Sequence, residues 1–169
     1  KHIKNLLGEV RVCIVTDDTV DALYSKDIEN SLQSQNLTFI KFVIPHGEAS
    51  KNASNLIALL EFLATNRITR SDAIIALGGG VVGDLAGFAA GVYLRGIKFV
   101  QIPTTLLSQI DSSIGGKTAI NFGGVKNTVG AFYQPKKVLI DPCLLASLPD
   151  RQIANGMAEA LKVALTSGG

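Results

Sequence analysis

The residues with the clearest chemical potential form a glycine-rich turn. Residues 73–77 are an apolar run that predicts a buried strand, and the segment GGGVVGD follows at residues 78–84. The small apolar residues after Asp84 favour a helix packed on that strand. Helix N-termini attract anions, and glycine lets a phosphate approach the backbone closely. Tight packing alone also produces such turns, so the spacing of Gly78, Gly80 and Gly83 indicates a pyrophosphate site only with support from other residues.

The elements around this turn alternate between strands and helices. We expect strands at residues 11–16, 38–44, 73–77 and 98–102, and helices at residues 20–34, 52–65 and 84–93. Helices between successive strands imply parallel pairing with right-handed crossovers. The strand at 73–77 is apolar on both faces, as in a sheet that helices cover on both sides. The predicted fold class is therefore α/β, a doubly wound, Rossmann-like parallel sheet, which binds ligands at the carboxyl ends of its strands.

Polar side chains follow each of the four predicted strands. They are Asp17, then Glu48 and Lys51, then Asp84 with the glycines, and finally Thr104 and Thr105. Each one alone is equally well explained as a helix cap, but four neighbouring strand ends together predict a nucleotide site. The ordinary dinucleotide pattern has an acid about 20 residues after the glycines, and none lies near Ile102. We therefore expect Asp17 to hold a ribose.

A second glycine-rich stretch has the sequence DSSIGGKT at residues 111–118, and Lys126 and Asn127 follow it. It is not a phosphate-binding P-loop, because that motif requires glycine where this chain has Asp111. Lysine binds phosphate or carboxylate as a point charge, so Lys117 and Lys126 are candidate anion-binding residues. The alternative is that both are ordinary solvated lysines.

Near the end of the chain, Glu159 and Lys162 are three residues apart on a predicted helix face. The simple interpretation is a helical ion pair, and the functional one is a carboxylate that binds a divalent metal. The histidines, His2 and His46, are not on this helix. A metal centre would therefore need ligands from outside this chain.

Composition limits the class of protein. The chain has 169 residues, 47% hydrophobic and 18% charged, with a net charge of +2, which suits one globular domain. This charge is too small to favour nucleic acid or an acidic membrane surface as a partner. We find neither an apolar run long enough to span a bilayer nor a signal peptide. Cys13 and Cys143 lack metal-site spacing, so we expect small core residues in a cytoplasmic protein.

In chain order, these motifs closely resemble the 3-dehydroquinate synthase family. The resemblance extends from about Val12 to Lys162. It rests on Pro45-x-Gly47-Glu48-x-x-Lys51, the 78–84 segment, Arg95-Gly96, Pro103-Thr104-Thr105, Asp111-Ser112-Ser113, Gly115-Gly116-Lys117-Thr118, Lys126-Asn127, Gly130-Ala131-Phe132 and Gly156-Met157-Ala158-Glu159.

The resemblance implies a lyase of the shikimate pathway that leads to aromatic amino acids. The family converts a small sugar phosphate, 3-deoxy-D-arabino-heptulosonate 7-phosphate, to 3-dehydroquinate and phosphate. The steps are transient oxidation by bound NAD, elimination of phosphate, re-reduction and intramolecular aldol closure. NAD and a divalent metal, zinc or cobalt, are the implied cofactors, and a homodimer is the expected assembly.

The family's site residues transfer to this chain by motif position. The implied NAD-binding residues are Asp17, Glu48, Lys51, Gly78, Gly79, Gly80, Val81, Asp84, Thr104, Thr105, Asp111, Ser112, Lys117 and Lys126. The implied substrate-binding and catalytic residues are Lys117, Asn127, Lys162, Asp111 and Arg95, the last reaching a neighbouring subunit's site. Glu159 is the one implied metal ligand.

The resemblance also divides the chain. Residues 1–149 correspond to an NAD-binding domain that lacks the family's first strands, and residues 150–169 to the first helix of a truncated C-terminal domain. The family's two histidine metal ligands belong to that second domain. We therefore expect the isolated chain to be inactive, with an exposed apolar surface between Met157 and Leu165.

Three alternatives remain open. The chain could belong to another sugar-phosphate cyclase, or to a glycerol or iron-type dehydrogenase, which releases reduced nucleotide as a product. Lys117 and the Lys126-Asn127 pair favour the synthase over the dehydrogenases. The chain by itself could also be an inactive nucleotide-binding module.

Overall fold

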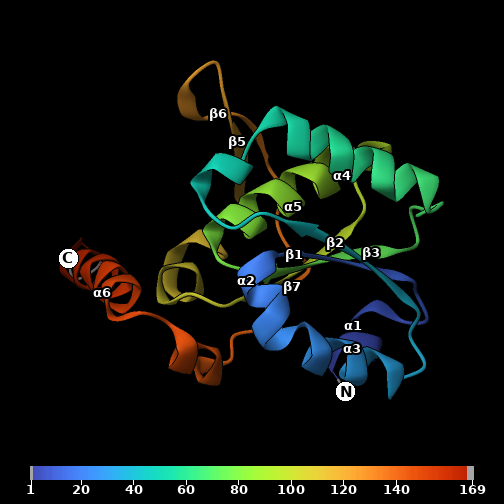
Figure 1. The fold of residues 1–169 in the computed structure, drawn as a ribbon, viewed down its shortest axis with the longest axis horizontal. Helices are drawn as coiled ribbons and strands as arrows, with labels where there is room; N and C mark the ends of the chain where they lie inside the picture. Colours follow the sequence, from blue (N-terminus) through green and yellow to red (C-terminus); the bar gives the residue numbers. More distant parts are fainter. Residues whose placement is uncertain (1, 167–169) are drawn as a thin grey trace.

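A parallel sheet between two layers of helices forms the centre of the computed structural model, which describes residues 2–166 (Figure 1). The sheet has five strands in the order β2-β1-β3-β4-β7, and all neighbours are parallel. The strands are β1 (Val12–Asp17), β2 (Phe39–Ile44), β3 (Ala73–Gly78), β4 (Lys98–Pro103) and β7 (Lys137–Val138). The predicted fold class is confirmed.

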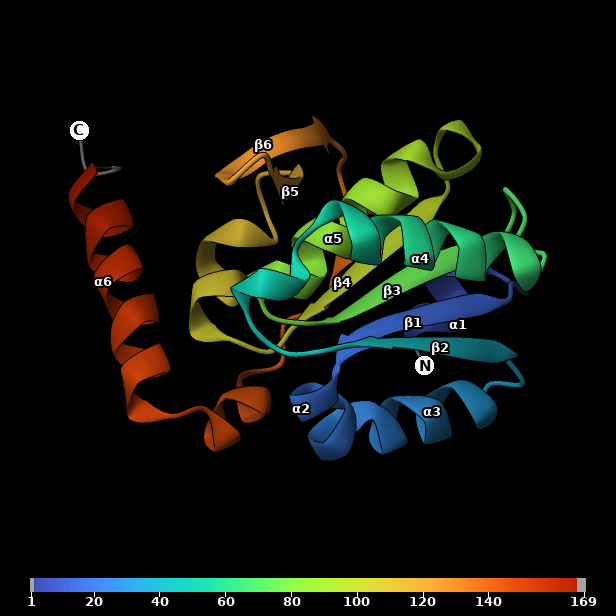
Figure 2. The ribbon, with the colours of Figure 1, turned by 45° about the horizontal axis from the view of Figure 1, so that its top comes forward.

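Helices cover both faces of the sheet, as Figure 2 shows. On one face lie α4 (Ala53–Thr65) and α5 (Gly80–Val92), and on the other lie α1 (His2–Leu7) and α3 (Lys26–Gln33). Side chains of β1 alternate between two apolar clusters, with Cys13 in the cluster of α4 and α5 and Ile14 in the other. Both residues are fully buried. This double burial explains why the central strands are apolar on both faces.

Two predicted helices differ from the structure. The helix expected at 20–34 is divided into α2 (Asp18–Val20), the π-helical turn η1 (Asp21–Ser25) and α3. The helix expected at 84–93 begins earlier, at Gly80, so the glycine segment supplies its first turn. The predicted helix at 52–65 is confirmed as α4. Its N-cap is Asn52, whose side chain accepts a hydrogen bond from the Asn55 N–H at 2.9 Å.

The sequence interpretation missed a β-hairpin. Strands β5 (Lys117–Phe122) and β6 (Val125–Phe132) pair antiparallel across Gly123 and Gly124, whose φ angles are 60° and 78°. Positive φ at both loop residues is the requirement of a tight two-residue hairpin turn, which glycine meets without strain. The hairpin lies close to α5, because a Cβ atom added at Gly87 would be 2.5 Å from Cγ2 of Thr118.

Past the hairpin, the chain forms a 3₁₀ turn, η5 (Pro142–Ser147), and then α6 (Asp150–Thr166). Helix α6 lies beyond the carboxyl edge of the sheet, next to the π-helical turn η4 (Ser108–Ser112) (Figures 1 and 2). Residues 167–169 of the predicted C-terminal segment lie outside the described residues. Met157, Leu161 and Leu165 are 50%, 60% and 84% exposed, which confirms the expected apolar surface.

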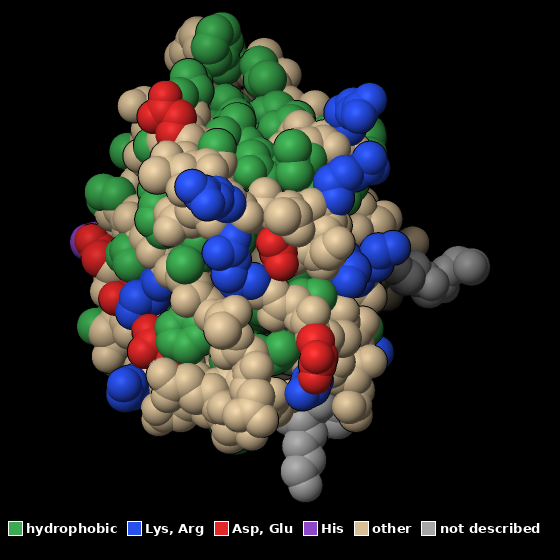
Figure 3. Space-filling view, turned by 90° about the vertical axis from the view of Figure 1, so that its right-hand side faces the viewer, with side chains coloured by type: hydrophobic (Ala, Val, Ile, Leu, Met, Phe, Trp, Pro, Cys, Tyr) green, Lys and Arg blue, Asp and Glu red, His purple; other side chains and the backbone are tan. Residues whose placement is uncertain are grey.

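The remaining surface carries charges of both signs. Figure 3 shows basic and acidic side chains interspersed on one face, with hydrophobic side chains gathered toward its upper part. No helix in residues 2–166 is long and apolar enough to cross a membrane. Cys13 is buried, and this burial raises the pKa of its thiol to about 12. The expectation of a core position was wrong for Cys143, which is exposed because it lies in the surface turn η5.

Candidate functional site

The glycine segment forms an uncapped helix N-terminus at the carboxyl edge of the sheet. Strand β3 ends at Gly78, Gly79 is the N-cap of α5, and no side chain caps this end of the helix. The first N–H groups of an α-helix have no partners within the helix, and the helix dipole favours negative charge there. Gly79, Gly80 and Val81 are partly exposed. The start of α5 is therefore open to an anion.

Hydroxyl side chains lie directly beside this turn. A Cβ atom at Gly79 would be 2.9 Å from Cγ2 of Thr105, and one at Gly80 would be 3.3 Å from Oγ of Ser112. The Thr105 hydroxyl is 2.8 Å from that of Ser108 in η4. Thr104 is buried, and its N–H donates to the Gly78 carbonyl at 3.0 Å. The structure thus gathers the glycines, both predicted threonines and Ser112 around one helix end.

A second group of predicted residues meets at Lys51, which follows the short 3₁₀ turn η2 (Glu48–Ser50). Lys51 is only 5% exposed, and its Nζ donates to Asp84 Oδ2 at 2.9 Å and to Asn127 Oδ1 at 2.6 Å. Glu48 Oε1 is 3.5 Å from the same Nζ. One buried cation therefore joins the segment after β2, helix α5 and strand β6.

The two carboxylates around Lys51 have opposite pKa shifts. Burial raises the pKa of Asp84 above its ordinary value, although the Lys51 ammonium acts in the other direction. Burial also acts to raise the pKa of Glu48. The Asn121 hydrogen bond and the Lys51 and Lys126 charges outweigh it and hold that pKa below the ordinary range. Glu48 is therefore the carboxylate whose ionised form its surroundings stabilise.

A cavity of about 350 Å³ adjoins this network, between α5 and the hairpin. Its lining includes Asp84, Lys117 and Asn127, which belong to three different elements. Lys117 and Lys126 are exposed. The cavity has a cation at its edge and hydrogen-bonding groups on its wall, which suits a small polar anion.

Helix α6 and η4 bring together the remaining predicted residues of the carboxyl edge. Lys162 Nζ donates to Glu159 Oε1 at 2.8 Å, which is the ion pair that their spacing indicates. This hydrogen bond raises the pKa of Lys162, and the Asp111 charge adds to the shift. Asp111 therefore lies within electrostatic reach of α6.

Arg95 lies apart from these groups, whereas Asp17 lies beside the glycine turn, because the residue before it, Thr16, pairs with Leu77 of β3. Asp17 is the last residue of β1, and its Oδ1 accepts hydrogen bonds from the N–H groups of Thr19 and Val20, so it caps α2. Arg95 lies in η3 (Tyr93–Arg95), beyond the far end of α5. That helix has 13 residues, which at ~1.5 Å per residue places Arg95 about 20 Å from the glycine turn. A role for Arg95 therefore remains a prediction that needs a neighbouring subunit.

The described residues do not build a metal centre by themselves. Among residues 4–166, whose side chains the structure describes, no three histidine, cysteine, aspartate or glutamate side chains are grouped so that they could hold a metal ion. Glu159 pairs with Lys162, and the ring nitrogen Nδ1 of His46 lies 2.7 Å from Asp18 Oδ1 on the surface. A catalytic zinc normally takes three protein ligands, and this donor set does not provide them.

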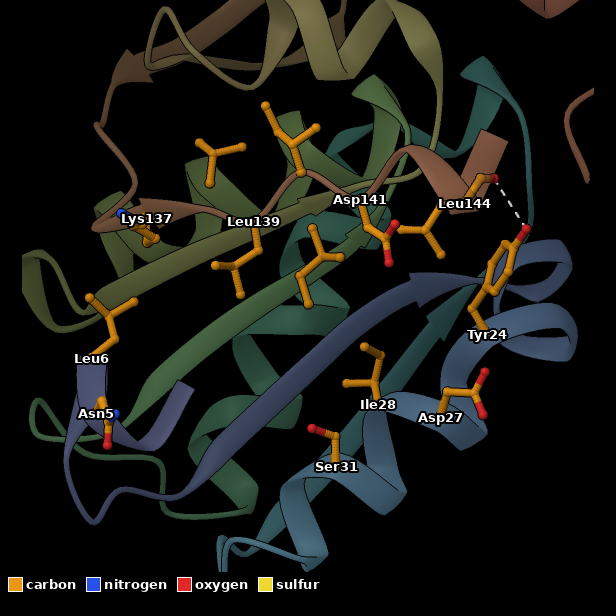
Figure 4. A pocket seen from close by; sticks show the side chains of 13 residues that line it. Asn5, Leu6, Tyr24, Asp27, Ile28, Ser31, Lys137, Leu139, Asp141 and Leu144 are labelled. Atoms are coloured by element: carbon orange, nitrogen blue, oxygen red, sulfur yellow. Dashed lines mark hydrogen bonds between the residues drawn. The ribbon is translucent and has the colours of Figure 1, made fainter. Parts of the chain in front are cut away.

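A larger cavity, of about 950 Å³, lies on the other face of the sheet (Figure 4). It is lined mostly by apolar side chains from α3 and the β7 edge, such as Ile28, Leu139 and Leu144, and by Tyr24, whose hydroxyl donates to the Leu144 carbonyl at 3.1 Å. None of the predicted site residues lines it. Its greater volume does not make it the site, because the predicted site residues gather elsewhere.

The sequence interpretation missed Asn121 in β5. Its amide Nδ2 donates to Glu48 Oε1 at 2.9 Å, and its Oδ1 accepts from the Asn127 N–H at 2.9 Å. The available signal was the Gly123-Gly124 pair between two apolar runs, a pattern typical of a hairpin. That signal predicts the turn, but it does not predict that Asn121 reaches Glu48.

The fold and this site together define the class of the protein. It is a doubly wound α/β domain with an open helix N-terminus and a buried lysine at the carboxyl edge of its sheet. More particularly, residues 41–155 match the 3-dehydroquinate synthase N-terminal family, and the chain belongs to that family.

Relatives and solved structures agree with this assignment. The chain is 52% identical over 163 residues to 3-dehydroquinate synthase of Streptococcus suis, covering 96% of this chain and 46% of the relative. It also resembles a 2-epi-5-epi-valiolone synthase from Streptomyces hygroscopicus with NAD⁺ and Zn²⁺ bound (TM-score 0.90, 36% identity, 96% and 45% of the two chains). A third similarity is to 2-deoxy-scyllo-inosose synthase complexed with carbaglucose-6-phosphate, NAD⁺ and Co²⁺ (TM-score 0.86, 32% identity, 91% and 42%). The chain thus spans about half the length of the curated relatives it matches.

Proposed function

We propose that this chain is the NAD-binding part of a 3-dehydroquinate synthase. The reaction is conversion of 3-deoxy-D-arabino-heptulosonate 7-phosphate to 3-dehydroquinate and phosphate, a lyase reaction. The observation that carries the proposal is the uncapped N-terminus of α5 beside the buried Lys51 network. The family membership and the NAD⁺ bound in two structural neighbours support it.

NAD fits the residues present at the carboxyl edge. The free N–H groups at the start of α5 would hold the pyrophosphate, with the hydroxyls of Thr105 and Ser112 beside them. Asp17 caps α2 through Oδ1, which leaves Oδ2 for a ribose hydroxyl. When bound, NAD supplies a group that can take up a hydride and return it. The chain's own part is to orient that group beside the Lys51 network.

The exposed cations would bind the anionic substrate. A phosphate or carboxylate that leaves water needs a positive countercharge. Lys117 lines the cavity and Lys126 lies near Glu48 of the Lys51 network, so both could supply that charge. Asn127 would hold a substrate hydroxyl from the cavity wall, and Lys162 and Asp111 would act from the side of α6. Arg95 would serve the site of a neighbouring copy in a homodimer.

The metal-dependent part of the reaction would need residues beyond those of this chain. We propose that α6 is the first helix of a second domain, and that Glu159 is one metal ligand among others contributed by that domain. The described residues form no metal centre, so the purified chain with zinc, NAD and the sugar phosphate should release no phosphate above background. Phosphate release at the rate of a full-length synthase would contradict this expectation.

NAD binding to the chain itself tests the proposal directly. Calorimetry should show saturable NAD binding to the wild-type chain. Gly80→Val should weaken it at least tenfold, because a branched side chain would enter the phosphate path beside Ser112. Gly115→Val is the matched control, since no atom lies within 4 Å of the added Cβ.

Absence of NAD binding to the folded wild-type chain would overturn the proposed function. Unchanged affinity in a folded Gly80→Val variant would overturn only the placement of the pyrophosphate. Circular dichroism of each variant distinguishes a lost site from a lost fold.

A further inference from the structure

Asn121 joins the hairpin to the segment that carries Glu48 and Lys51. Its backbone N–H donates to the Lys51 carbonyl at 2.8 Å, and it forms an isolated parallel bridge with Asn52. Its side chain makes two further hydrogen bonds, to the Glu48 carboxylate and from the Asn127 N–H, both at 2.9 Å. The backbone contacts attach the hairpin to the segment after β2. A substitution of the Asn121 side chain would leave these backbone contacts in place and remove only the side-chain hydrogen bonds.

The partners of the Asn121 amide determine its orientation. A backbone N–H can only donate, so it requires the carbonyl oxygen Oδ1, and an ionised carboxylate can only accept, so it requires the NH₂ group. The surroundings of Glu48 stabilise that ionised form, as its lowered pKa indicates. Aspartate could keep the bond from Asn127, but it would place a second carboxylate against Glu48. Alanine would lose both bonds.

Both bonds act on groups that contact Lys51. Asn127 has a φ of 56°, in the left-handed region, and its N–H is held by Asn121. In this position the Asn127 side chain accepts from Lys51 Nζ at 2.6 Å, and Glu48 lies 3.5 Å from the same atom. The pairing of β5 with β6 is irregular between Ile120 and Phe122, which is where Asn121 lies. Such irregularities often redirect a side chain near a functional site.

We propose that Asn121 is a positioning residue of the NAD site, which holds Glu48 and Asn127 against Lys51 through its side-chain amide. This inference rests on the proposed function, because it takes NAD as the ligand. Asn121 thereby couples the cofactor side of the site to the hairpin that carries Lys117 and Lys126.

The test is NAD binding by calorimetry between pH 3 and pH 8, a range that includes the lowered pKa of Glu48, with the variants Asn121→Ala and Asn121→Asp. Both should bind NAD roughly tenfold more weakly at pH 7, as expected for loss of a hydrogen bond to a charged group. The pH at which affinity falls on acidification should also move upward in both variants. The shift should be larger in Asn121→Asp, because a neighbouring carboxylate favours protonation of Glu48.

The matched control is Asn66→Ala, which removes a hydrogen bond from Asn66 Nδ2 to the Phe62 carbonyl at the end of α4. It should bind NAD as the wild type does. Asn121→Asp keeps the acceptor for the Asn127 N–H, so it remains informative if Asn121→Ala fails to fold.

The outcomes are distinguishable. A wild-type chain that binds no NAD would overturn the proposed function and this inference together. Wild-type binding with both variants matching it at every pH would overturn the inference alone. An equal loss of affinity at all pH values would also overturn it, because a purely structural role would produce that result.

Discussion

The sheet body, consisting of β1 to β4 with α4 and α5, and the outer strand β6 of the hairpin are stabilised by different interactions, whereas β5 joins the core of the body through Ile120. In the body, Ile14, Ile75 and Leu85 are completely buried. In the hairpin, Val125 and Phe132 are 60% and 83% exposed, and polar bonds of Asn121 and Lys51 attach it to the segment after β2. Apolar burial tolerates variation in partners, whereas a polar junction depends on geometry. The chemistry therefore lies where the two regions meet.

The largest expected effect on stability comes from a substitution that would create a new cavity in the apolar core of the sheet body. Leu85 lies on the buried face of α5, and Leu85→Ala should lower the free energy of unfolding by about 2–5 kcal/mol. The matched hairpin change, Val129→Ala, affects a side chain that is 39% exposed and should cost about 0.5 kcal/mol. Urea unfolding of both variants measures the difference. Equal losses would show that the two regions do not differ in this way.

A smaller effect is expected at the polar junction, and it should depend on pH. The folded-state pKa of Glu48 is lowered, so its carboxylate adds stability above the ordinary pKa of 4.5 and loses it as pH falls through the folded-state value. Glu48→Gln should therefore destabilise the chain at pH 7 and have almost no effect near pH 3. The side chain is 40% exposed, so the loss should stay below about 1 kcal/mol.

Unfolding measured at both pH values checks this expectation. Glu61→Gln is the control, because it changes an exposed carboxylate on α4. A Glu48→Gln effect of equal size at pH 3 and pH 7 would show that the charge of Glu48 does not stabilise the junction.

The parts of the molecule that local pattern controls were predictable. The four strands from β1 to β4 and helix α4 follow from hydrophobic periodicity and turn residues, and the structure confirms them. The glycine segment at the end of β3 was also predicted, although its residues form the first turn of α5 and not a loop before it. Glycine has a weak helix propensity, so its sequence signal favours a loop even where packing produces a helix.

Other features depend on contacts between distant segments. The π-helical turn at Asp21–Ser25 interrupts an otherwise regular helical pattern, and no periodicity in the sequence marks it. The exposure of Cys143 depends on the course of η5 over the surface. The bond between Asn121 and Glu48 joins residues 73 positions apart.

The sequence by itself determined the α/β class, the glycine turn at the carboxyl edge and the identity of the charged residues near it. Each of these depends on a local property: the hydrophobic period of a strand or helix, or the residue type at a strand end. The tertiary structure alone decided that Lys51 is buried between Asp84 and Asn127, and that Arg95 lies at the far end of α5. Burial and ion pairing depend on which surfaces pack together, and such packing is a property of the whole chain.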